Sequence, residues 1–348
     1  MNHADVLGRD VTFYRLARTP TVEEHDGPIR LYRVGRRANV AKLDLAPGLF
    51  RTLRRLLCDL PDVWHLHAPN PTMMLALLAL PRLRPLVITH HSDIVRQRRL
   101  RWAFGPIERA AYRRATRILA TSEEYAKGSE ILRSFAAKVI AVPLGIDASP
   151  FREPNATALT HAVHFLKMCG APLWLVVGRL ISYKALPVAL EVLKHVPGKL
   201  LVVGTGPLEA ELKRTAESLG VGDRVVWHGS ASSDELVGAY LAATALWFPS
   251  AARSEAFGLV QVEAMAAGCP VINAAIAGSG VPWVCRHDRE GFTAPVGDPV
   301  AFAALANRML EPGTRERLAS AGRQRAASEF DHRLMAERTL AIYRDALR

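Results

Sequence analysis

The stretch Leu200–Arg214 reads LLVVGTGPLEAELKR, and it joins a short β-branched run to an amphipathic segment through the glycine turn at 204–207. A strand that passes through such a turn into a helix is the building unit of α/β proteins with parallel sheets. The turn half-matches the dinucleotide-binding fingerprint, but Glu209 occupies the third glycine position, where a carboxylate would face a pyrophosphate. The stretch therefore predicts a strand-to-helix unit, and a tight turn near a helix start explains its glycines at least as well as phosphate binding.

The same alternation of short β-branched runs and amphipathic segments extends over the 348 residues. The expected strands are Val11–Arg15, Ile29–Val34, Val63–His67, Leu86–Thr89, Arg117–Ala120, Lys138–Val142, Leu173–Val177, Lys199–Val203, Arg224–His228, Ala245–Phe248 and Val271–Asn273. Helices are expected over Pro187–His195, Leu208–Leu219, Ser233–Ala243 and Val260–Ala267. The pattern predicts parallel sheets with helices on both faces.

The Pro- and Gly-rich segment Pro143–Pro154 marks the expected domain boundary. We expect two doubly wound Rossmann-type α/β domains, residues 1–150 and 151–330, that face a cleft. A C-terminal helix over residues 331–348 is expected to pack back on the first domain. In such sheets ligands bind beyond the carboxyl ends of the strands.

Composition excludes several other classes of protein. Hydrophobic residues make up 49% of the chain, which is enough for a sizeable core. The longest apolar run, Met73–Leu80, is far shorter than the ~20 residues of a membrane span, and the N-terminus is too polar for a signal peptide. The cysteines are too dispersed for a zinc site or a disulfide framework, and they are expected to be buried thiols in a reducing cytoplasm: Cys58, Cys169, Cys269 and Cys285.

The net charge of +12 is concentrated in the first half of the chain, where residues 1–150 hold 24 basic and 14 acidic residues. Such a half suits an anionic partner, and a solvated arginine-rich surface is the alternative. The segment Val95–Ile118 is the most basic, and Arg109, Arg113 and Arg117 recur every four residues, as on one helical face. Its other arginines and aromatic residues are Arg96, Arg98, Arg99, Arg101, Arg114, Trp102 and Phe104, and a second basic segment combines Leu53–Leu57 with Arg51, Arg54 and Arg55. We expect docking on anionic lipid rather than nucleic acid, because the aromatic residues are too sparse for a stacking platform.

Two stretches of the second half carry candidate site residues. In VVGRLISYKA (Val176–Ala185) a buried strand is followed by Arg179 and Lys184 before a helix, an arrangement that suits a diphosphate. In SEAFGLVQVEAMAAG (Ser254–Gly268) Glu255 lies in a loop and Glu263 follows eight residues later inside an apolar helix. A carboxylate there can accept hydrogen bonds from two sugar hydroxyls, and a solvent-facing glutamate is the alternative.

The run from Glu255 to Glu263 resembles the E-x7-E motif of the retaining glycosyltransferases of family 4, which have the GT-B fold. The neighbouring motifs agree in order: GRL with Lys184, VVGTGP at 202–207, the glutamate pair, and the glycine-rich loop GSGVPW at 278–283. VPLGID at 142–147 is also similar to the family pattern. The resemblance covers roughly Val11 to the C-terminus and is most specific over residues 170–300.

The resemblance implies a role for each matching residue. Arg179 and Lys184 would bind the donor diphosphate, Glu255 would contact the donor sugar, and Glu263 would bind the ribose. Further donor contacts are implied for Gly204, Phe257, Gly258, Leu259 and Val260, and the nucleobase is expected near Trp227–Ser232. No separate cofactor is expected, because the nucleotide sugar is a substrate.

The first half contributes a histidine pair at the end of an expected strand, in VITHHSD (Val87–Asp93). His91 matches the active-site histidine of the family, and His90 is the adjacent alternative. His67 and Asn70 are acceptor-side candidates, with core and turn roles as the alternative. No Asp-x-Asp occurs, and the Glu and His residues are dispersed. We therefore expect no metal, and Arg179, Lys184 and helix N–H groups would stabilise the leaving group.

One departure from the family concerns the N-terminus. The family begins with a strand, a Gly-rich loop and a helix, whereas Val11–Arg15 resembles its second strand and Gly8 is the only early glycine. The first strand and its loop are therefore expected to be missing from this chain. We expect a cytoplasmic, metal-independent retaining hexosyltransferase, such as a mannosyl- or glucosyltransferase, associated peripherally with the inner face of the plasma membrane. It would move a sugar from a nucleotide sugar to a saccharide or polyprenyl-linked acceptor. The alternative is a non-catalytic nucleotide-sugar-binding or partner protein, and a nicotinamide dehydrogenase is a more distant one.

Overall fold

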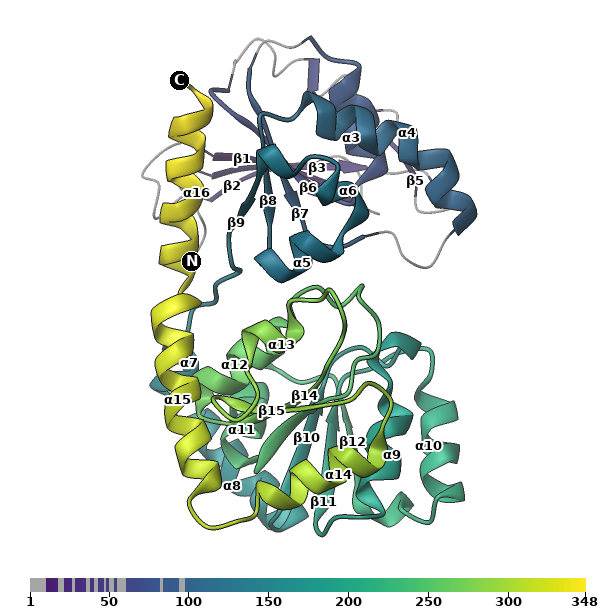
Figure 1. The fold of residues 1–348 in the computed structure, drawn as a ribbon, viewed down its shortest axis with the longest axis vertical. Helices are drawn as coiled ribbons and strands as arrows, with labels where there is room; N and C mark the ends of the chain where they lie inside the picture. The colour runs from purple at the N-terminus through teal and green to yellow at the C-terminus, as the bar shows by residue number, and fades with distance from the viewer. Residues whose placement is uncertain are drawn as a thin grey trace. The chain divides into compact units, whose positions relative to one another are not determined.

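The computed structural model describes residues 11–17, 22–26, 29–35, 38–40, 43–46, 48–49, 53–54, 61–81, 84–93 and 98–348. The chain divides into two compact units (Figure 1). The first unit comprises Met1–Pro143 with Arg333–Arg348, and the second is the continuous segment Leu144–His332. The chain therefore passes between the units twice. Within the described residues, no helix is both long and apolar enough to cross a membrane.

The second unit contains a six-stranded parallel sheet in the order β12-β11-β10-β13-β14-β15. Its strands are β10 (Leu173–Val177), β11 (Lys199–Val203), β12 (Val225–Gly229), β13 (Ala245–Phe248), β14 (Val271–Ala274) and β15 (Gly291–Ala294). This is the doubly wound order 3-2-1-4-5-6, which confirms the expected α/β fold. The strand order reverses between β10 and β13, and that reversal defines the place where ligands bind in such sheets.

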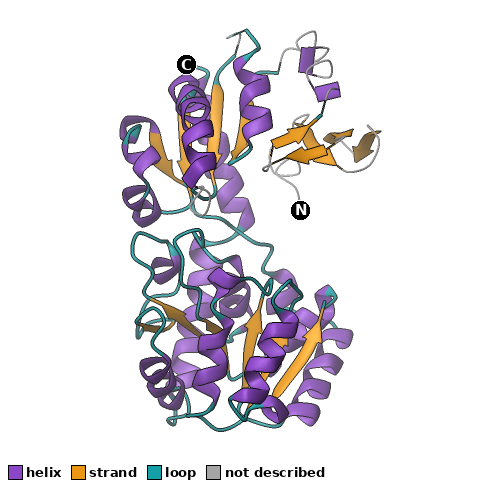
Figure 2. Cartoon of the chain, turned by 90° about the vertical axis from the view of Figure 1, so that its right-hand side faces the viewer, coloured by secondary structure: helices purple, strands orange, loops and turns teal. Residues whose placement is uncertain are grey.

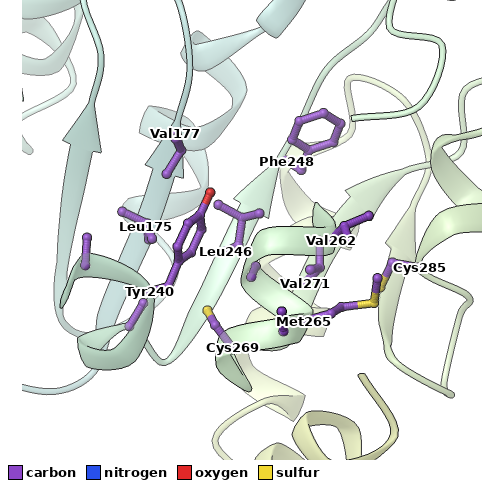
Figure 3. Close-up of a cluster of buried hydrophobic side chains, with 14 of the residues drawn as sticks. Leu175, Val177, Tyr240, Leu246, Phe248, Val262, Met265, Cys269, Val271 and Cys285 are labelled. Carbon is purple, nitrogen blue, oxygen red and sulfur yellow. The ribbon is translucent and has the colours of Figure 1, made fainter. Parts of the chain in front are cut away.

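Alternate residues of these strands pack against helices on opposite faces of the sheet. Leu175 of β10 belongs to one hydrophobic core and Trp174 to the other, as the period of two in a strand requires. The first core includes residues of α8 (Ala156–Cys169), α11 (Ser233–Ala242), α12 (Leu259–Ala267) and α15 (Thr314–Glu329). The second core includes residues of α9 (Leu186–Leu193), α10 (Glu209–Ser218) and α14 (Pro299–Arg308). Helices thus cover both faces of the sheet (Figure 2), and Figure 3 shows part of the first core.

The first unit contains a four-stranded parallel sheet in the order β6-β7-β8-β9. Its strands are β6 (Trp64–Ala68), β7 (Leu86–His90), β8 (Arg117–Ala120) and β9 (Val139–Ala141), and its helices are α3 (Pro71–Leu78), α4 (Arg98–Arg114), α5 (Glu123–Gly128) and α6 (Glu130–Arg133). The C-terminal helix α16 (His332–Ala346) packs on this sheet through Ile342, which shares a core with Val87 and Leu119. Tyr343 hydrogen-bonds to His65, and Arg117 pairs with Asp345 at 2.7 Å.

The earlier strands form separate, smaller sheets. β1 (Val11–Ala17) pairs in parallel with β3 (Ile29–Gly35), which pairs antiparallel with β2 (Val22–Asp26). β4 (Ala38–Val40) and β5 (Leu43–Leu45) form an antiparallel pair. The prediction of strands at Val11–Arg15 and Ile29–Val34 is thus correct, but their placement in a purely parallel sheet is wrong. β2 and β3 are separated by only two residues in the sequence, too few for a parallel crossover, and they pair antiparallel.

The expected arginine face of Val95–Ile118 is also corrected. Helix α4 ends at Arg114, so Arg117 begins β8 instead of lying on the same helical face as Arg109 and Arg113. Lys138 Nζ donates to the carbonyl oxygens of Arg113 (2.8 Å) and Ala115 (2.6 Å), which satisfies acceptors left open where the helix ends. Arg51, Arg55, Cys58 and Arg96 lie outside the described residues, as do the side chains of Arg98, Arg99, Arg101 and Trp102.

Candidate functional site

The candidate site of the second unit lies on the loops that follow β10, β11, β13 and β14. The loops after β10 and β11 approach so closely that glycine is required. A Cβ on Gly204 would lie 2.0 Å from the carbonyl oxygen of Gly178, and one on Gly206 would lie 2.4 Å from that of Leu180. Gly204 also has a φ of +139°, which disfavours a side chain. The glycine turn at 204–207 therefore has a packing role.

Lys184 and Glu255 meet at the reversal point of the sheet, although they are 71 residues apart in the chain. Lys184 Nζ donates to Glu255 Oε2, and the side chains are 13% and 12% exposed. The ammonium group also lies 4.7 Å from the ring centroid of Phe248, the last residue of β13. The loops themselves are joined by a hydrogen bond of 2.8 Å from Ala251 N to the carbonyl oxygen of Tyr183. The structure thus brings together two residues that the sequence places in one site.

Arg179 differs from Lys184 in its surroundings. Its side chain is exposed, and it has no hydrogen-bond or ion-pair partner among the described residues. Its guanidinium group keeps all its donors available to a ligand, and this planar group suits a phosphate. The loop after β10 therefore supplies Lys184, which is already paired with Glu255, and Arg179, which has no side-chain partner among the described residues.

Glu255 is held by more than Lys184. Ser250 Oγ donates to Glu255 Oε2 at 3.2 Å, and Ser279 Oγ donates to the backbone carbonyl of Glu255. Ser250 is fully buried, and nothing in the sequence motif pointed to it. Its only sequence signal is its position two residues beyond β13.

Helix α12 begins at Leu259, directly after Gly258. Gly258 has a φ of +76°, and a Cβ there would lie 2.8 Å from Phe248, so this position also requires glycine. No side chain caps the helix. The N–H groups of its first two residues, Leu259 and Val260, are therefore available to an anion. The side chain of Phe257 is 3% exposed and packs edge-on against Phe330 at 5.6 Å. Phe257 can therefore contact a donor only through its backbone.

Glu263 lies one turn further along α12. Tyr240 Oη donates to Glu263 Oε2 at 2.8 Å. Burial raises the pKa of the Glu263 carboxyl, and the hydrogen bond from Tyr240 partly offsets this rise. Burial likewise raises the pKa of Tyr240 well above its ordinary value, so the phenol keeps its proton and donates it. Sequence reasoning missed Tyr240, because an aromatic residue on an amphipathic helix is indistinguishable from an ordinary core residue.

In the segment expected to contact the nucleobase, Trp227–Ser232, some side chains are already engaged in contacts within the unit. Ser232 caps α11 in a reciprocal capping box with Glu235. Trp227 is half-buried, and Lys213 Nζ lies 5.8 Å from its ring centroid. Within the described residues, no group of three or more His, Cys, Asp or Glu side chains is arranged to hold a metal ion.

The histidines of the first unit lie at the carboxyl ends of β6 and β7. His67 Nδ1 and His91 Nε2 are 2.8 Å apart, and their rings stack with centroids 5.1 Å apart. Burial, followed by the charges of His67 and His90, lowers the pKa of His91 to about 4, so its imidazole is neutral at pH 7. His90 is fully buried, with Asp93 3.1 Å from its Nε2, and Asn70 caps α3 by accepting from Met73 N at 3.1 Å. The contacts of His90 and Asn70 favour structural roles for these two residues. The side chain of His91 is only half-buried, which leaves it the better candidate for contact with a ligand.

Sequence comparisons cover both halves of the chain. Residues 166–325 match the model of the family described as glycosyl transferases group 1. Residues 3–145 match that of the glycosyl transferase 4-like domain. A D-rhamnosyltransferase of Pseudomonas aeruginosa is 32% identical over 263 residues, which are 76% of this chain and 68% of the relative. An O-antigen chain mannosyltransferase of Escherichia coli is 28% identical, over 82% of this chain and 77% of the relative.

Solved structures agree on the fold. A sucrose-phosphate synthase of Thermosynechococcus elongatus superimposes with a TM-score of 0.81 and 23% identity, over 99% of this chain and 90% of the other. Anabaena HepE in complex with UDP superimposes with a TM-score of 0.76 and 20% identity, over 91% and 86% of the two chains. On the matches to both halves and this shared architecture, the chain belongs to the group 1 glycosyltransferases and has their GT-B fold.

Proposed function

We propose that this glycosyltransferase moves a hexosyl group from a nucleotide sugar to a hydroxyl of a saccharide or polyprenyl-linked acceptor, with retention of anomeric configuration. The observation that carries the proposal is the Lys184–Glu255 pair at the reversal point of the sheet. A cation and a carboxylate side by side suit the two sides of the bond that breaks, the diphosphate and the sugar.

Each residue has a role in this proposal. Arg179, Lys184 and the N–H groups at the start of α12 stabilise the departing diphosphate without a metal ion. Glu255 accepts hydrogen bonds from the sugar hydroxyls, and Glu263 accepts them from the ribose. As the resemblance to family 4 implies, the neutral imidazole of His91 donates a hydrogen bond to a hydroxyl of the sugar or to developing charge there. Retention follows from the resemblance to family 4.

The relatives narrow the donors worth testing. Two of them are described as a D-rhamnosyltransferase and an O-antigen chain mannosyltransferase, and a third as a GDP-mannose-dependent mannosyltransferase. A structural neighbour was solved with UDP-glucose. We propose a cytoplasmic enzyme of polysaccharide or glycolipid biosynthesis whose donor is a GDP- or UDP-linked hexose.

The test uses the purified full chain with UDP, GDP, UDP-glucose and GDP-mannose. Thermal stabilisation by one nucleoside diphosphate is expected, together with its release from the matching nucleotide sugar when a polyprenyl-linked saccharide is added. EDTA should leave the rate unchanged. Binding without turnover of any donor would favour the non-catalytic alternative, and no binding of either nucleotide would refute a donor site here.

Peripheral attachment to anionic lipid is part of the proposal, and among the described side chains of Val95–Ile118 it rests on Arg109 and Arg113 of α4, which are exposed. Arg114 does not contribute, because it donates to carbonyl oxygens of Leu80 (3.2 Å) and Pro81 (2.9 Å), and Arg117 is paired with Asp345. Each arginine near an anionic surface contributes about 1 kcal/mol. Cosedimentation with phosphatidylglycerol vesicles should fall with rising salt, and the double variant R109Q/R113Q should bind less. Binding that ignores lipid charge would contradict this attachment.

A further inference from the structure

Two fully buried side-chain amides lie beneath the loops that carry Glu255. Gln261 on α12 and Asn273 on β14 are both 0% exposed. Burying an amide is unfavourable unless its polar atoms find partners. The contacts of these two side chains therefore indicate what they hold in place.

Gln261 donates to two backbone segments, and Asn273 donates to one of these segments and to Gln261 itself. Gln261 Nε2 lies 3.0 Å from the carbonyl oxygen of Phe257 and 3.4 Å from that of Val281. Asn273 Nδ2 lies 2.9 Å from Gln261 Oε1 and 3.0 Å from the carbonyl oxygen of Cys285, with that of Val281 at 3.3 Å. The two NH2 groups thus join the loop after β13 to the short helix α13 (Val281–Val284), and the bond from Asn273 to Gln261 joins the two side chains.

A third buried side chain fixes the far end of α13. Arg325 of α15 is 5% exposed, and it donates to the carbonyl oxygens of Val284 at 3.1 Å and Trp283 at 3.0 Å. The carbonyls of this one-turn helix, and that of Cys285 directly after it, are thus bound by side chains from α12, β14 and α15. A helix of four residues has almost no stability of its own, so these contacts determine where it lies.

The start of α13 is in turn attached to Glu255. Gly280 N donates to the carbonyl oxygen of Ala256 at 3.0 Å, and Ser279 Oγ donates to that of Glu255. Any shift of α13 therefore moves the backbone that carries the Glu255 carboxylate.

We propose that Gln261 and Asn273 are positioning residues for the transfer reaction, which hold Glu255 at the donor sugar through Phe257 and α13. This inference rests on the proposed role of Glu255. Neither amide has exposed surface, so neither can touch a substrate. Glu263 is held by Tyr240 instead, and Arg179 lies on the loop after β10, so these two nucleotide contacts do not depend on the pair. The amides thus control turnover more than nucleotide affinity.

The test compares Q261M and N273L, which keep side-chain size and remove the hydrogen bonds, with a matched control in the full chain. The control T244V removes the acceptor for Leu173 N (3.1 Å) at the amino-terminal edge of the same sheet. We measure kcat and KM for the nucleotide sugar that the wild type turns over, the Kd for UDP and GDP, and the Tm. Each amide variant should lose at least tenfold in kcat with Kd within twofold of wild type, and T244V should keep kcat within twofold.

Hydrogen exchange provides a readout that needs no activity. In Q261M and N273L, amides of residues 251–258 and 278–285 should exchange faster than in wild type, while those of β10 and β11 should be unchanged. The proposal is overturned if kcat falls no more than in T244V, or if exchange rises evenly over the unit. If the wild type binds no nucleotide and turns over no donor, the proposed function fails, and the exchange pattern alone decides whether the pair holds Glu255.

Discussion

Glu263 is largely buried, yet its proposed role in binding the ribose requires an ionised carboxylate. A ribose hydroxyl pair binds an ionised carboxylate better than a protonated one, because only the ionised form accepts with both oxygens. Burial raises the pKa of this carboxyl above its ordinary range. Relative to the unfolded chain, the folded state therefore favours the protonated form, and ionised Glu263 lowers the stability of the unit at pH values above its folded-state pKa.

Nucleotide affinity should therefore fall on acidification, beginning above the pH at which an ordinary glutamate titrates, ~4.3. Titrations of the wild type with UDP or GDP between pH 8 and pH 5 should show this loss. E263Q should bind about 10- to 100-fold more weakly at pH 7.5, since a hydrogen bond to a charged group contributes about 1.5–3 kcal/mol. Its affinity should also lose the Glu263 part of the pH dependence. Parallel pH profiles for the two proteins would contradict the role of Glu263.

Arg179 and Lys184 should separate binding from stability. R179A should weaken nucleoside diphosphate binding at least tenfold with little change in the free energy of unfolding, because the exposed guanidinium has no partner among the described residues. K184M should weaken binding and also cost about 1–3 kcal/mol, because it leaves a largely buried carboxylate on Glu255 without its cation. Isothermal titration and urea unfolding check both. Equal stability losses in the two variants would contradict the contrast.

At the scale of elements, the loops after β10 and β11 work as one packed layer. G204A should cost about 3 kcal/mol or more, because its Cβ must displace the Gly178 carbonyl and its φ is unfavourable. G220A is the matched control: its φ is +69°, but no atom lies within 4 Å of the added Cβ, so about 1 kcal/mol is expected. Urea unfolding compares the two variants. Similar losses would show that backbone strain, rather than contact between the loops, sets the cost.

The elements also show which strands and which site residues can be predicted from the sequence. Strands β10, β11 and β13 were predicted with their observed bounds, because they are fully or almost fully buried runs of apolar residues. The sequence does not predict β2 (VEEHD) and β15 (GFTA), because the charged residues of β2 and the glycine of β15 are not typical of strands. Motifs predict the candidate residues Arg179, Lys184, Glu255 and Glu263, whereas no motif points to Tyr240, Ser250 or the Gln261–Asn273 pair. Their roles depend on contacts between elements, which local periodicity does not encode.

At the scale of the whole molecule, the first unit is completed by the last helix of the chain. I342A should destabilise this unit by about 2–3 kcal/mol, because Ile342 is 8% exposed in a core shared with β7 and β8. UDP or GDP affinity should be unchanged, since the residues proposed to bind the nucleotide lie in the second unit. L347A, at a 48% exposed position, is the control. Calorimetry with and without nucleotide measures both effects, and a loss of nucleotide affinity in I342A would contradict this separation.

The division of the chain also sets an order of events during synthesis. The second unit is a continuous insert, Leu144–His332, within the sequence of the first. On the ribosome the insert can acquire its whole sheet while the first unit still lacks α16, because domains fold as units as they emerge. His65 and Arg117 can meet their partners Tyr343 and Asp345 only after those two residues have left the exit tunnel. The second unit, which holds the proposed nucleotide site, is therefore expected to fold first, and one face of the four-stranded sheet stays uncovered until α16 has emerged.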